Sequence, residues 1–368
     1  MKKVMLVFGT RPEAIKMCPL VLELRQRTNL NTIVCVSGQH REMLDSVLNA
    51  FSVTPEYNLS IMDSNQTLFD ITNKVMTGLR DVLDSEKPDV VLVHGDTTTS
   101  YAAALCAFYL GIPVGHVEAG LRTYNIRSPF PEEFNRQAVD ILADLAFAPT
   151  ETTRDNLIRE GKNPQNVYVT GNTAIDALKT TVRADYSHPE LIWANDSRLI
   201  MLTAHRRENL GTPMRRIFRA ISRVVDETAD LKVIYPVHLN PVVRAAAESE
   251  IGDHPRIRLI KPLDVLDFHN FLARAYLILT DSGGIQEEAP SLGKPVLVLR
   301  DTTERPEGVK AGTLKLIGTD ENAVYEGFSQ LVNDKKLYES MSKASNPYGD
   351  GFASKRIANI LEKWRSNQ

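Results

Sequence analysis

Short runs of β-branched and other apolar residues alternate along the chain with longer segments in which apolar positions recur every three or four residues. The short runs are typical of strands buried on both faces of a parallel sheet, and the longer segments are typical of amphipathic helices. In the first half, the pattern predicts strands at residues 3–8, 32–37, 90–94, 114–117, 145–148 and 167–170. It predicts helices at residues 14–27, 42–51, 68–83, 99–110, 133–142 and 152–160.

The same alternation restarts in the second half of the chain. Here the pattern predicts strands at residues 199–202, 233–235, 258–260, 277–279 and 296–299. It predicts helices at residues 214–228, 242–250, 268–273, 321–332 and 352–364. Strands that alternate with helices in this way favour the α/β class, with two Rossmann-like doubly wound domains in tandem.

The break between the two series is expected near Gly171, because Gly171-Asn172 interrupts the chain and residues 187–196 have only weak periodicity. We therefore expect an N-terminal Rossmann-like domain at 1–171 and a C-terminal, nucleotide-binding one at 172–351. The final helix, 352–368, is expected to pack back on the N-terminal domain.

Composition narrows the range of functions. The 368 residues are 43% hydrophobic and 24% charged, as in ordinary globular proteins, and the net charge of -3 leaves no positive excess for nucleic acid. The apolar run 4–8 is too short for a signal peptide, and no run approaches the roughly 20 residues of a membrane span, so a cytoplasmic protein with no membrane partner is expected. The cysteines Cys18, Cys35 and Cys106 lie far apart, which favours reduced core thiols over a metal site.

The first candidate site follows the first predicted strand. Arg11 and Lys16 stand near the start of a helix, where the helix dipole disfavours cations, so a bound anion is expected there. The alternative is a capped turn with solvated charges.

A second candidate site follows strand 277–279. Gly283 and Gly284 let backbone N–H groups approach a diphosphate at a helix N-terminus, Ser282 can cap that helix, and Glu288 is placed to accept ribose hydroxyls. A glycine-rich turn without a ligand is the alternative.

Acidic residues form the third group. Asp96 and Glu118 follow consecutive strands, and Glu132 follows a proline-bounded loop, so carboxylates are expected to gather at one edge of the sheet. Alternatively, Asp96 caps helix 99–110 and Glu118 pairs with Arg122.

The fourth group is His205 with the arginines that follow it, after strand 199–202. Histidine can titrate or bind phosphate, and arginine binds phosphate through two hydrogen bonds. The chain has no Gly-x-Gly-x-x-Gly after a strand and no P-loop sequence, so a diphosphate ligand without nicotinamide remains.

Taken together, these motifs resemble the non-hydrolysing UDP-N-acetylglucosamine 2-epimerases, in family order and over nearly the whole chain. The segments that carry the resemblance are residues 9–16 (GTRPEAIK), 94–97 (HGDT), 116–122 (HVEAGLR), 130–136 (FPEEFNR), 203–209 (TAHRREN) and 280–288 (TDSGGIQEE).

The resemblance implies a GT-B-like fold in which the two domains face a cleft that holds a UDP-sugar. It implies reversible conversion of UDP-N-acetylglucosamine into UDP-N-acetylmannosamine for bacterial surface polysaccharide, by a homodimer without cofactor or metal. By position, it assigns substrate contacts to Arg11, Lys16, Phe268, Ser282, Gly283, Gly284, Glu288 and Arg305. It assigns catalytic roles to Asp96, Glu118, Glu132 and His205.

The expected chemistry agrees with the missing dinucleotide motif. No carbonyl acidifies the hydrogen at C2 of the sugar, so inversion without nicotinamide requires elimination of UDP, reprotonation from the opposite face and re-addition of UDP. Carboxylates would move the protons, and cations would stabilise the departing diphosphate. A GT-B glycosyltransferase and a non-catalytic UDP-sugar sensor are the alternatives; the first needs no base for C2 and the second gains nothing from the carboxylates.

A second UDP-N-acetylglucosamine binds beside the active site in some relatives of this family. The residues that resemble its contacts are Gln39, His40, Glu132, Arg207 and His238. The alternative is that Gln39 and His40 only cap the helix that begins near Glu42.

Overall fold

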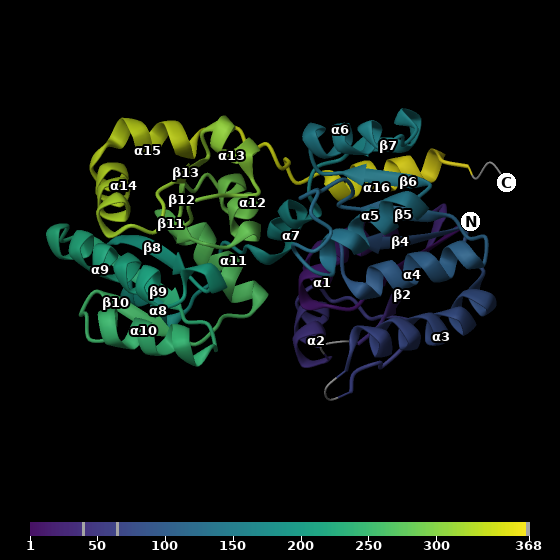
Figure 1. Cartoon of the computed structure of the whole chain (residues 1–368), viewed down its shortest axis with the longest axis horizontal. Coiled ribbons are helices and arrows are strands. Elements are labelled where there is room, and N and C mark those ends of the chain that lie inside the picture. Colours follow the sequence, from purple (N-terminus) through teal and green to yellow (C-terminus); the bar gives the residue numbers. More distant parts are fainter. Residues whose placement is uncertain (39–40, 64–65, 366–368) are drawn as a thin grey trace. The chain divides into compact units, whose positions relative to one another are not determined.

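The computed structural model describes residues 1–38, 41–63 and 66–365 (Figure 1). The chain divides into two compact units: unit 1 is Met1–Thr180 together with the chain from Tyr348 onward, and unit 2 is Thr181–Pro347. Each unit is an α/β fold built on one parallel sheet, which confirms the fold class expected from the alternation of apolar runs.

The sheet of unit 1 has the order β3-β2-β1-β4-β5-β6-β7, and its described strand pairs are parallel. Its strands are β1 (Lys2–Phe8), β2 (Leu30–Val36), β3 (Tyr57–Asn58), β4 (Val90–His94), β5 (Val114–Val117), β6 (Leu145–Ala148) and β7 (Val167–Val169). Its helices are α1 (Arg11–Arg25), α2 (Arg41–Ala50), α3 (Leu68–Glu86), α4 (Thr98–Tyr109), α5 (Glu132–Leu142), α6 (Glu151–Arg159), α7 (Thr173–Thr181) and α16 (Ala353–Lys363). A 3-10 turn, η1 (Pro164–Asn166), precedes β7.

The sheet of unit 2 has the order β10-β9-β8-β11-β12-β13, also with parallel pairs. Its strands are β8 (Arg198–Thr203), β9 (Leu231–Pro236), β10 (Ile257–Ile260), β11 (Leu277–Thr280), β12 (Val296–Val298) and β13 (Leu314–Leu316). Its helices are α8 (Pro189–Trp193), α9 (Thr212–Glu227), α10 (Pro241–Ile251), α11 (Val265–Arg274), α12 (Gly283–Ser291), α13 (Pro306–Ala311), α14 (Glu321–Asn333) and α15 (Lys335–Ser342), with a 3-10 turn, η2 (Arg207–Asn209).

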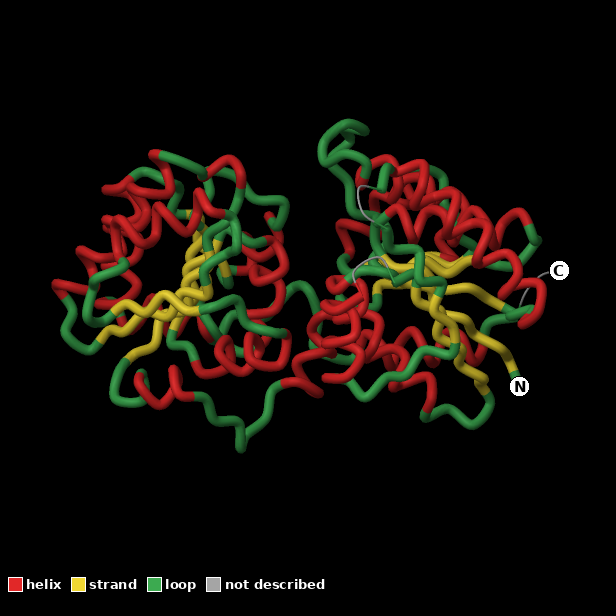
Figure 2. Tube along the Cα trace, turned by 90° about the horizontal axis from the view of Figure 1, so that it is seen from below, coloured by secondary structure: helices red, strands yellow, loops and turns green. Residues whose placement is uncertain are grey.

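Helices cover both faces of each sheet (Figure 2). In unit 2, for example, Leu202 and Leu279 pack with Phe218 of α9 on one face, whereas Met201 packs with Phe271 of α11 on the other. Because both faces are covered, the strands are nearly continuous apolar runs, which is the pattern that made them visible in the sequence.

Each sheet reverses its strand order once, between β1 and β4 in unit 1 and between β8 and β11 in unit 2. Ligands of open α/β sheets bind beyond the carboxyl ends of the strands at such a switch point, because the two flanking loops run in opposite directions there. The loops that begin at Gly9, Gly95, Ala204 and Asp281 are therefore the expected ligand-binding loops.

The two units divide after Thr180, later than the break expected near Gly171, and the segment of weak periodicity that follows contains α8. Unit 1 extends beyond Gly171 through Thr180 because α7 is held by the end of the chain. Asp176 accepts hydrogen bonds from the backbone N–H groups of Ala353 (3.2 Å) and Ser354 (2.8 Å). The final helix, α16, packs against α1. The short strands β3 and β13 were not predicted, because runs of two and three residues carry no measurable periodicity.

The three cysteines are buried and unbonded. Burial raises the pKa of Cys18 and Cys35 to about 12, which keeps both as thiols. Across the described residues, no helix is both long enough and apolar enough to cross a bilayer.

Candidate functional site

The turn after β1 is built around a buried glutamate. Glu13, only 2% exposed, accepts the backbone N–H groups of Gly9 (3.0 Å) and Thr10 (2.7 Å) through Oε2. Its other oxygen accepts the hydroxyls of Thr97 (2.7 Å) and Ser100 (2.8 Å), from the loop after β4 and from α4. One carboxylate thus fixes both loops of the unit 1 switch point to each other.

Lys16 and Glu118 lie together beside this turn. Lys16 of α1 forms an ion pair with Oε2 of Glu118, which also accepts the Asn172 side-chain amide at 3.2 Å. The alternative, in which Glu118 pairs with Arg122, is wrong, because Arg122 instead contacts Asp140 and Glu160. Glu118 has φ of +68°, a left-handed conformation that non-glycine residues adopt at a cost and that is common at functional sites.

His94, the last residue of β4, points at the same carboxylate. Its Nε2 lies 3.7 Å from Oε2 of Glu118, too far for a hydrogen bond, and has no hydrogen-bond partner within the described structure. Burial lowers the pKa of His94 to about 3, although Glu118 opposes the shift, so the ring is neutral near pH 7. His94 was given no role from the sequence; its place at a strand end was the available signal.

Asp96 follows Gly95, at the end of β4. Its side chain forms an ion pair with Arg136 of α5, and its backbone carbonyl accepts the Asn135 amide at 2.9 Å. Asp96 does not cap α4, as the alternative supposed; Thr97 does, by accepting the Ser100 N–H at 3.1 Å. The Asp96 carboxylate is therefore free of a capping role and 28% exposed.

The loops of Asp96 and Glu118 are adjacent. The Gly95 N–H donates to the Val117 carbonyl at 2.9 Å, and a Cβ atom placed on Gly95 would lie 3.6 Å from Oε1 of Glu118. Glu132, partly exposed, is the first residue of α5, one turn before the Arg136 that holds Asp96. Arg11 is the first residue of α1. Unit 1 thus places the predicted carboxylates and cations beyond the carboxyl ends of β1, β4 and β5.

In unit 2, the N-terminus of α12 is flanked by two guanidinium groups. A Cβ atom on Gly283 would lie 3.6 Å from Arg305 and 3.7 Å from Arg206, so both side chains reach the start of this helix. Ser282 occupies the N-cap position without a side-chain capping bond, and the first turn has no acidic residue. Helix N–H groups and two arginines around Gly283 and Gly284 make a favourable anion site, and one of the two is Arg206, from the arginines that follow His205.

His205 is held at the end of β8 by Asp281. The backbone N–H groups of His205 and Arg206 both donate to Oδ2 of Asp281 at 2.8 Å, and the His205 ring stacks on His238 with centroids 5.3 Å apart. Burial lowers the pKa of His205, although Asp281 partly opposes this. Arg207 and His238 are exposed, whereas Gln39 and His40 lie outside the described residues.

Glu288 and Phe268 lie on α12 and α11. The Glu288 carboxylate is 13% exposed and lies 3.6 Å from Nε2 of His269, whose Nδ1 contacts the Thr181 hydroxyl at 2.7 Å. A Cβ atom on Gly284 would lie 3.8 Å from Oε1 of Glu288, which puts this carboxylate next to the anion site. Phe268 is partly exposed in the second turn of α11.

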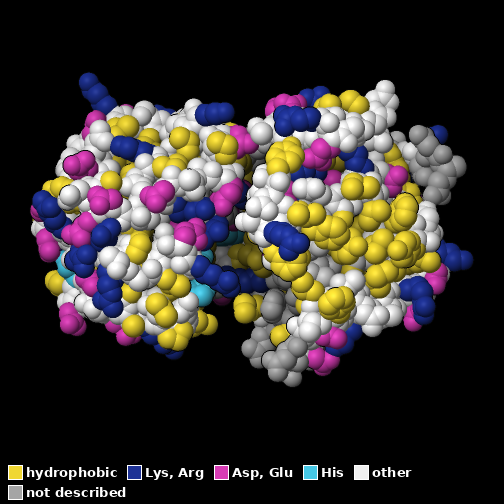
Figure 3. All heavy atoms as spheres, viewed as in Figure 1, with side chains coloured by type: hydrophobic (Ala, Val, Ile, Leu, Met, Phe, Trp, Pro, Cys, Tyr) yellow, Lys and Arg dark blue, Asp and Glu magenta, His cyan; other side chains and the backbone are white. Residues whose placement is uncertain are grey.

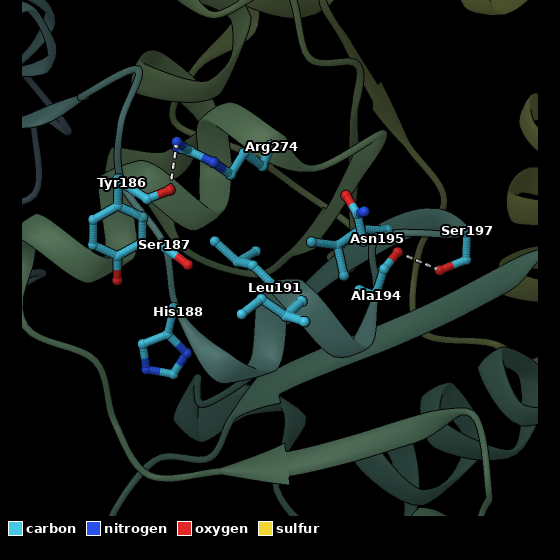
Figure 4. Close-up of a pocket in the computed structure, with 10 residues that line it drawn as sticks. Tyr186, Ser187, His188, Leu191, Ala194, Asn195, Ser197 and Arg274 are labelled. Atoms are coloured by element: carbon cyan, nitrogen blue, oxygen red, sulfur yellow. Dashed lines mark hydrogen bonds between the residues drawn. The ribbon is translucent and has the colours of Figure 1, made fainter.

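A separate cavity of about 410 Å³ lies elsewhere in unit 2 (Figure 4). It is lined by Tyr186, Ser187, His188, Leu191 and Arg274, with residues around the start of β8, and none of the predicted site residues lines it. The Arg274 guanidinium donates to the Tyr186 and Arg183 carbonyls, each at 2.9 Å, so it serves to fasten this segment to α11. Among the described residues, no group of three or more His, Cys, Asp or Glu side chains is placed to hold a metal ion.

Comparison with known proteins gives consistent matches over the whole fold. Residues 22–362 match the sequence model of a family described as UDP-N-acetylglucosamine 2-epimerase. The UDP-N-acetylglucosamine 2-epimerase of Bacillus subtilis (strain 168) is 61% identical over 359 residues, which cover 98% of this chain and 94% of that protein.

Solved structures with bound nucleotides are also similar. The S. aureus MnaA–UDP co-structure has a TM-score of 0.90 and 56% identity, and covers 98% of this chain and 96% of that one. The Neisseria meningitidis UDP-GlcNAc 2-epimerase bound to UDP-GlcNAc has a TM-score of 0.89 and 48% identity, and covers 98% of this chain and 100% of that one.

Proposed function

This chain belongs to the UDP-N-acetylglucosamine 2-epimerase family, and on that premise we propose that it interconverts UDP-N-acetylglucosamine and UDP-N-acetylmannosamine by inverting C2. The observation that carries the proposal is the N-terminus of α12 with Arg206 and Arg305 beside Gly283. This arrangement suits a diphosphate, and relatives of known structure bind UDP or UDP-GlcNAc.

In the proposed reaction the C1–O bond breaks and UDP leaves with the bonding electrons, while a carboxylate takes the C2 proton and a C1–C2 double bond forms. A proton then returns to C2 on the opposite face, and UDP adds back to C1. Asp96, Glu118 and Glu132 are the proposed acids and bases. Arg11, Lys16, His205 and the start of α12 would stabilise the departing diphosphate.

Phe268 is proposed to pack on the uracil ring and Glu288 to accept the ribose hydroxyls. The partly exposed face of Phe268 and the position of the Glu288 carboxylate beside Gly284 support these roles. The reaction needs no added cofactor, because elimination and re-addition involve no net oxidation. Its product would supply cell-surface polysaccharide synthesis from the cytoplasm, where nucleotide sugars are made.

Turnover in D2O tests this mechanism. Purified protein and UDP-N-acetylglucosamine, without acceptor or NAD, should yield both epimers with deuterium at C2, because the carboxylate that takes the proton exchanges it with solvent. Proton NMR resolves the epimers and their C2 positions. Product that retains its original C2 hydrogen would exclude the elimination route, and UDP release that depends on an acceptor sugar would indicate a transferase.

The surface of unit 1 favours a homodimer. Apolar side chains on α3 to α5 are exposed, including Phe69 (87%), Phe108 (55%), Tyr109 (67%) and Ile141 (77%), and Figure 3 shows hydrophobic side chains gathered over these helices. Contiguous apolar patches are typical of protein interfaces, and a second copy is the proposed occupant because the like patches of two copies can cover each other about a two-fold axis. Sedimentation should give a dimer that Tyr109→Lys dissociates and Ile192→Lys, at an exposed position of unit 2, does not.

A second UDP-N-acetylglucosamine site stays a proposal that rests on the family resemblance. Arg207 and His238 are exposed near His205, as such a site requires. Its ligand would act by binding one conformation better than another.

A further inference from the structure

A buried histidine lies directly beneath the loop that carries Asp96. His116, in β5, is fully buried, and its Nε2 lies 2.8 Å from the Gly95 carbonyl oxygen. Its other nitrogen, Nδ1, lies 2.6 Å from Oδ1 of Asp140, on α5. The ring therefore connects α5 to the peptide group that joins Gly95 to Asp96.

The second oxygen of Asp140 holds the loop of Glu118. It accepts the Gly120 N–H at 3.2 Å and the Arg122 guanidinium at 2.7 Å, and Arg122 also contacts Glu160. Gly120 has φ of +86°, and a Cβ atom there would lie 2.2 Å from the Thr153 carbonyl oxygen, so only glycine fits at this position.

The hydrogen-bond acceptors around His116 determine where the protons of this network lie. A carbonyl can only accept, so Nε2 of His116 carries a proton toward Gly95, and a further proton is shared between Nδ1 and Asp140. Burial raises the pKa of Asp140, but His116 and Arg122 more than offset this and the pKa lies below its ordinary value. Asp140 is thus a carboxylate with both oxygens occupied.

We propose that His116 and Asp140 are positioning residues of the epimerisation, which hold the loops of Asp96 and Glu118 in register. The proposal rests on the proposed function. One carboxylate reaches the Glu118 loop directly through Gly120 and the Asp96 loop through His116. Two acid–base groups that serve one carbon need this constraint, because displacement of a reacting group by about 1 Å can lower a rate by roughly 10²-fold.

Helix α5 connects all the proposed acid–base groups. Its first residue is Glu132, Asn135 and Arg136 contact Asp96, and Asp140 lies in its next turn. The proposed acid–base groups are thus all on α5 or attached to it. A movement of α5 would displace them together.

The positioning role predicts a change in kcat that is separate from nucleotide binding. His116→Phe keeps an aromatic ring, although a somewhat larger one, but removes both hydrogen bonds, so kcat should fall by about 10- to 100-fold. The Kd for UDP should change less than about twofold, because neither His116 nor Asp140 bonds to a proposed UDP contact. His116→Gln can still donate to the Gly95 carbonyl and should recover part of the lost kcat.

The matched control is a His–Asp pair outside the site, in which Nε2 of His254 lies 3.0 Å from Oδ1 of Asp226. His254→Phe should keep wild-type kcat. Hydrogen exchange of the folded variants should show faster exchange at residues 95–97 and 118–122 in His116→Phe only.

Wild-type kcat and exchange in His116→Phe would overturn the positioning role, as would a kcat loss that His116→Gln does not relieve. If His116→Phe does not fold, His116→Gln decides the question alone, because positioning predicts reduced kcat with unchanged UDP affinity. An inactive wild-type protein would instead refute the proposed function, and with it the role assigned to His116.

Discussion

The ammonium group of Lys16 is paired with the carboxylate of Glu118, although the two residues come from the first helix and from the loop after β5. The pair joins a cation proposed to meet diphosphate with a carboxylate proposed to move a proton. When UDP leaves, the negative charge of its diphosphate would draw Lys16 away from Glu118 and leave the carboxylate more basic. In the proposed mechanism, Lys16 would then couple the departure of UDP to proton transfer.

Neutral amides should separate catalysis from binding. Glu118→Gln, Asp96→Asn and Glu132→Gln should each lower kcat on the order of 10²-fold or more, which is the scale of a positioned acid or base. UDP affinity measured by calorimetry should not fall in any of the three variants. Glu151→Gln, at an exposed position of α6, is the control. A variant that turns over like the wild type would remove its residue from the catalytic set.

Loss of an arginine at α12 should have the opposite effect. Arg305→Ala removes a charge-assisted contact worth about 1.5–3 kcal/mol and should weaken UDP binding by roughly 10- to 100-fold. The UDP affinity of Arg305→Lys should lie between those of the wild type and Arg305→Ala, because lysine keeps the charge but not the paired donors. Arg215→Ala, which loses contacts to Ser249 and Glu250 on α10, should bind UDP normally. Equal UDP affinity in all three variants would show that α12 is not the diphosphate site.

The neutral His94 predicts how stability depends on pH. Its pKa is about 3 in the folded protein, against an ordinary histidine value of 6.5, so below pH 6.5 the unfolded chain takes up a proton that the folded chain does not. Stability should therefore fall with decreasing pH, by about 1.4 kcal/mol per pH unit from this residue. The free energy of unfolding, measured with urea at several values between pH 6 and pH 4, should depend less steeply on pH in His94→Gln than in the wild type. This holds whatever the stability of the variant at neutral pH. An equal pH dependence in the two proteins would show that the pKa of His94 is the same in the folded and unfolded chain.

A second substrate site would be visible in the reverse direction. UDP-N-acetylmannosamine alone should react slowly until a trace of UDP-N-acetylglucosamine accumulates or is added, because the second ligand would favour the active conformation. His238→Ala should empty the second site. The variant should then react without a lag if its active conformation no longer depends on the second ligand, or react slowly throughout if activation by that ligand is lost. Hyperbolic, lag-free kinetics in the wild type would exclude the site.

Much of the fold was predictable because its strands are buried on both faces. Runs such as residues 3–8 and 90–94 therefore stand out from the polar segments around them. The break expected at Gly171 lies too early, because what holds α7 in unit 1 cannot be seen in the local sequence. α7 is positioned by contacts from Asp176 to residues far along the chain, and such contacts leave no local periodicity.

The candidate site was predictable in its residue types but not in its pairings. Strand ends revealed Asp96 and Glu118, yet only the structure shows that their partners are Arg136 and Lys16. These partners come from other elements, so spacing cannot identify them. Arg206 was recognised from the sequence only as one of the arginines after His205, because its place beside the N-terminus of α12 depends on a segment that is distant in sequence.

The discontinuity of unit 1 has a consequence for the order in which the protein acquires its structure during synthesis. The whole of unit 2 is translated before α16, which contacts α1 and whose Asn359 and Glu362 bond Arg27 at 3.0 and 3.1 Å. Domains generally fold as they emerge from the ribosome, but here the N-terminal unit must wait for the last segment of the chain to cover α1. A chain that ends at Pro347 would therefore contain all of the C-terminal unit but an N-terminal unit whose α1 lacks the cover of α16.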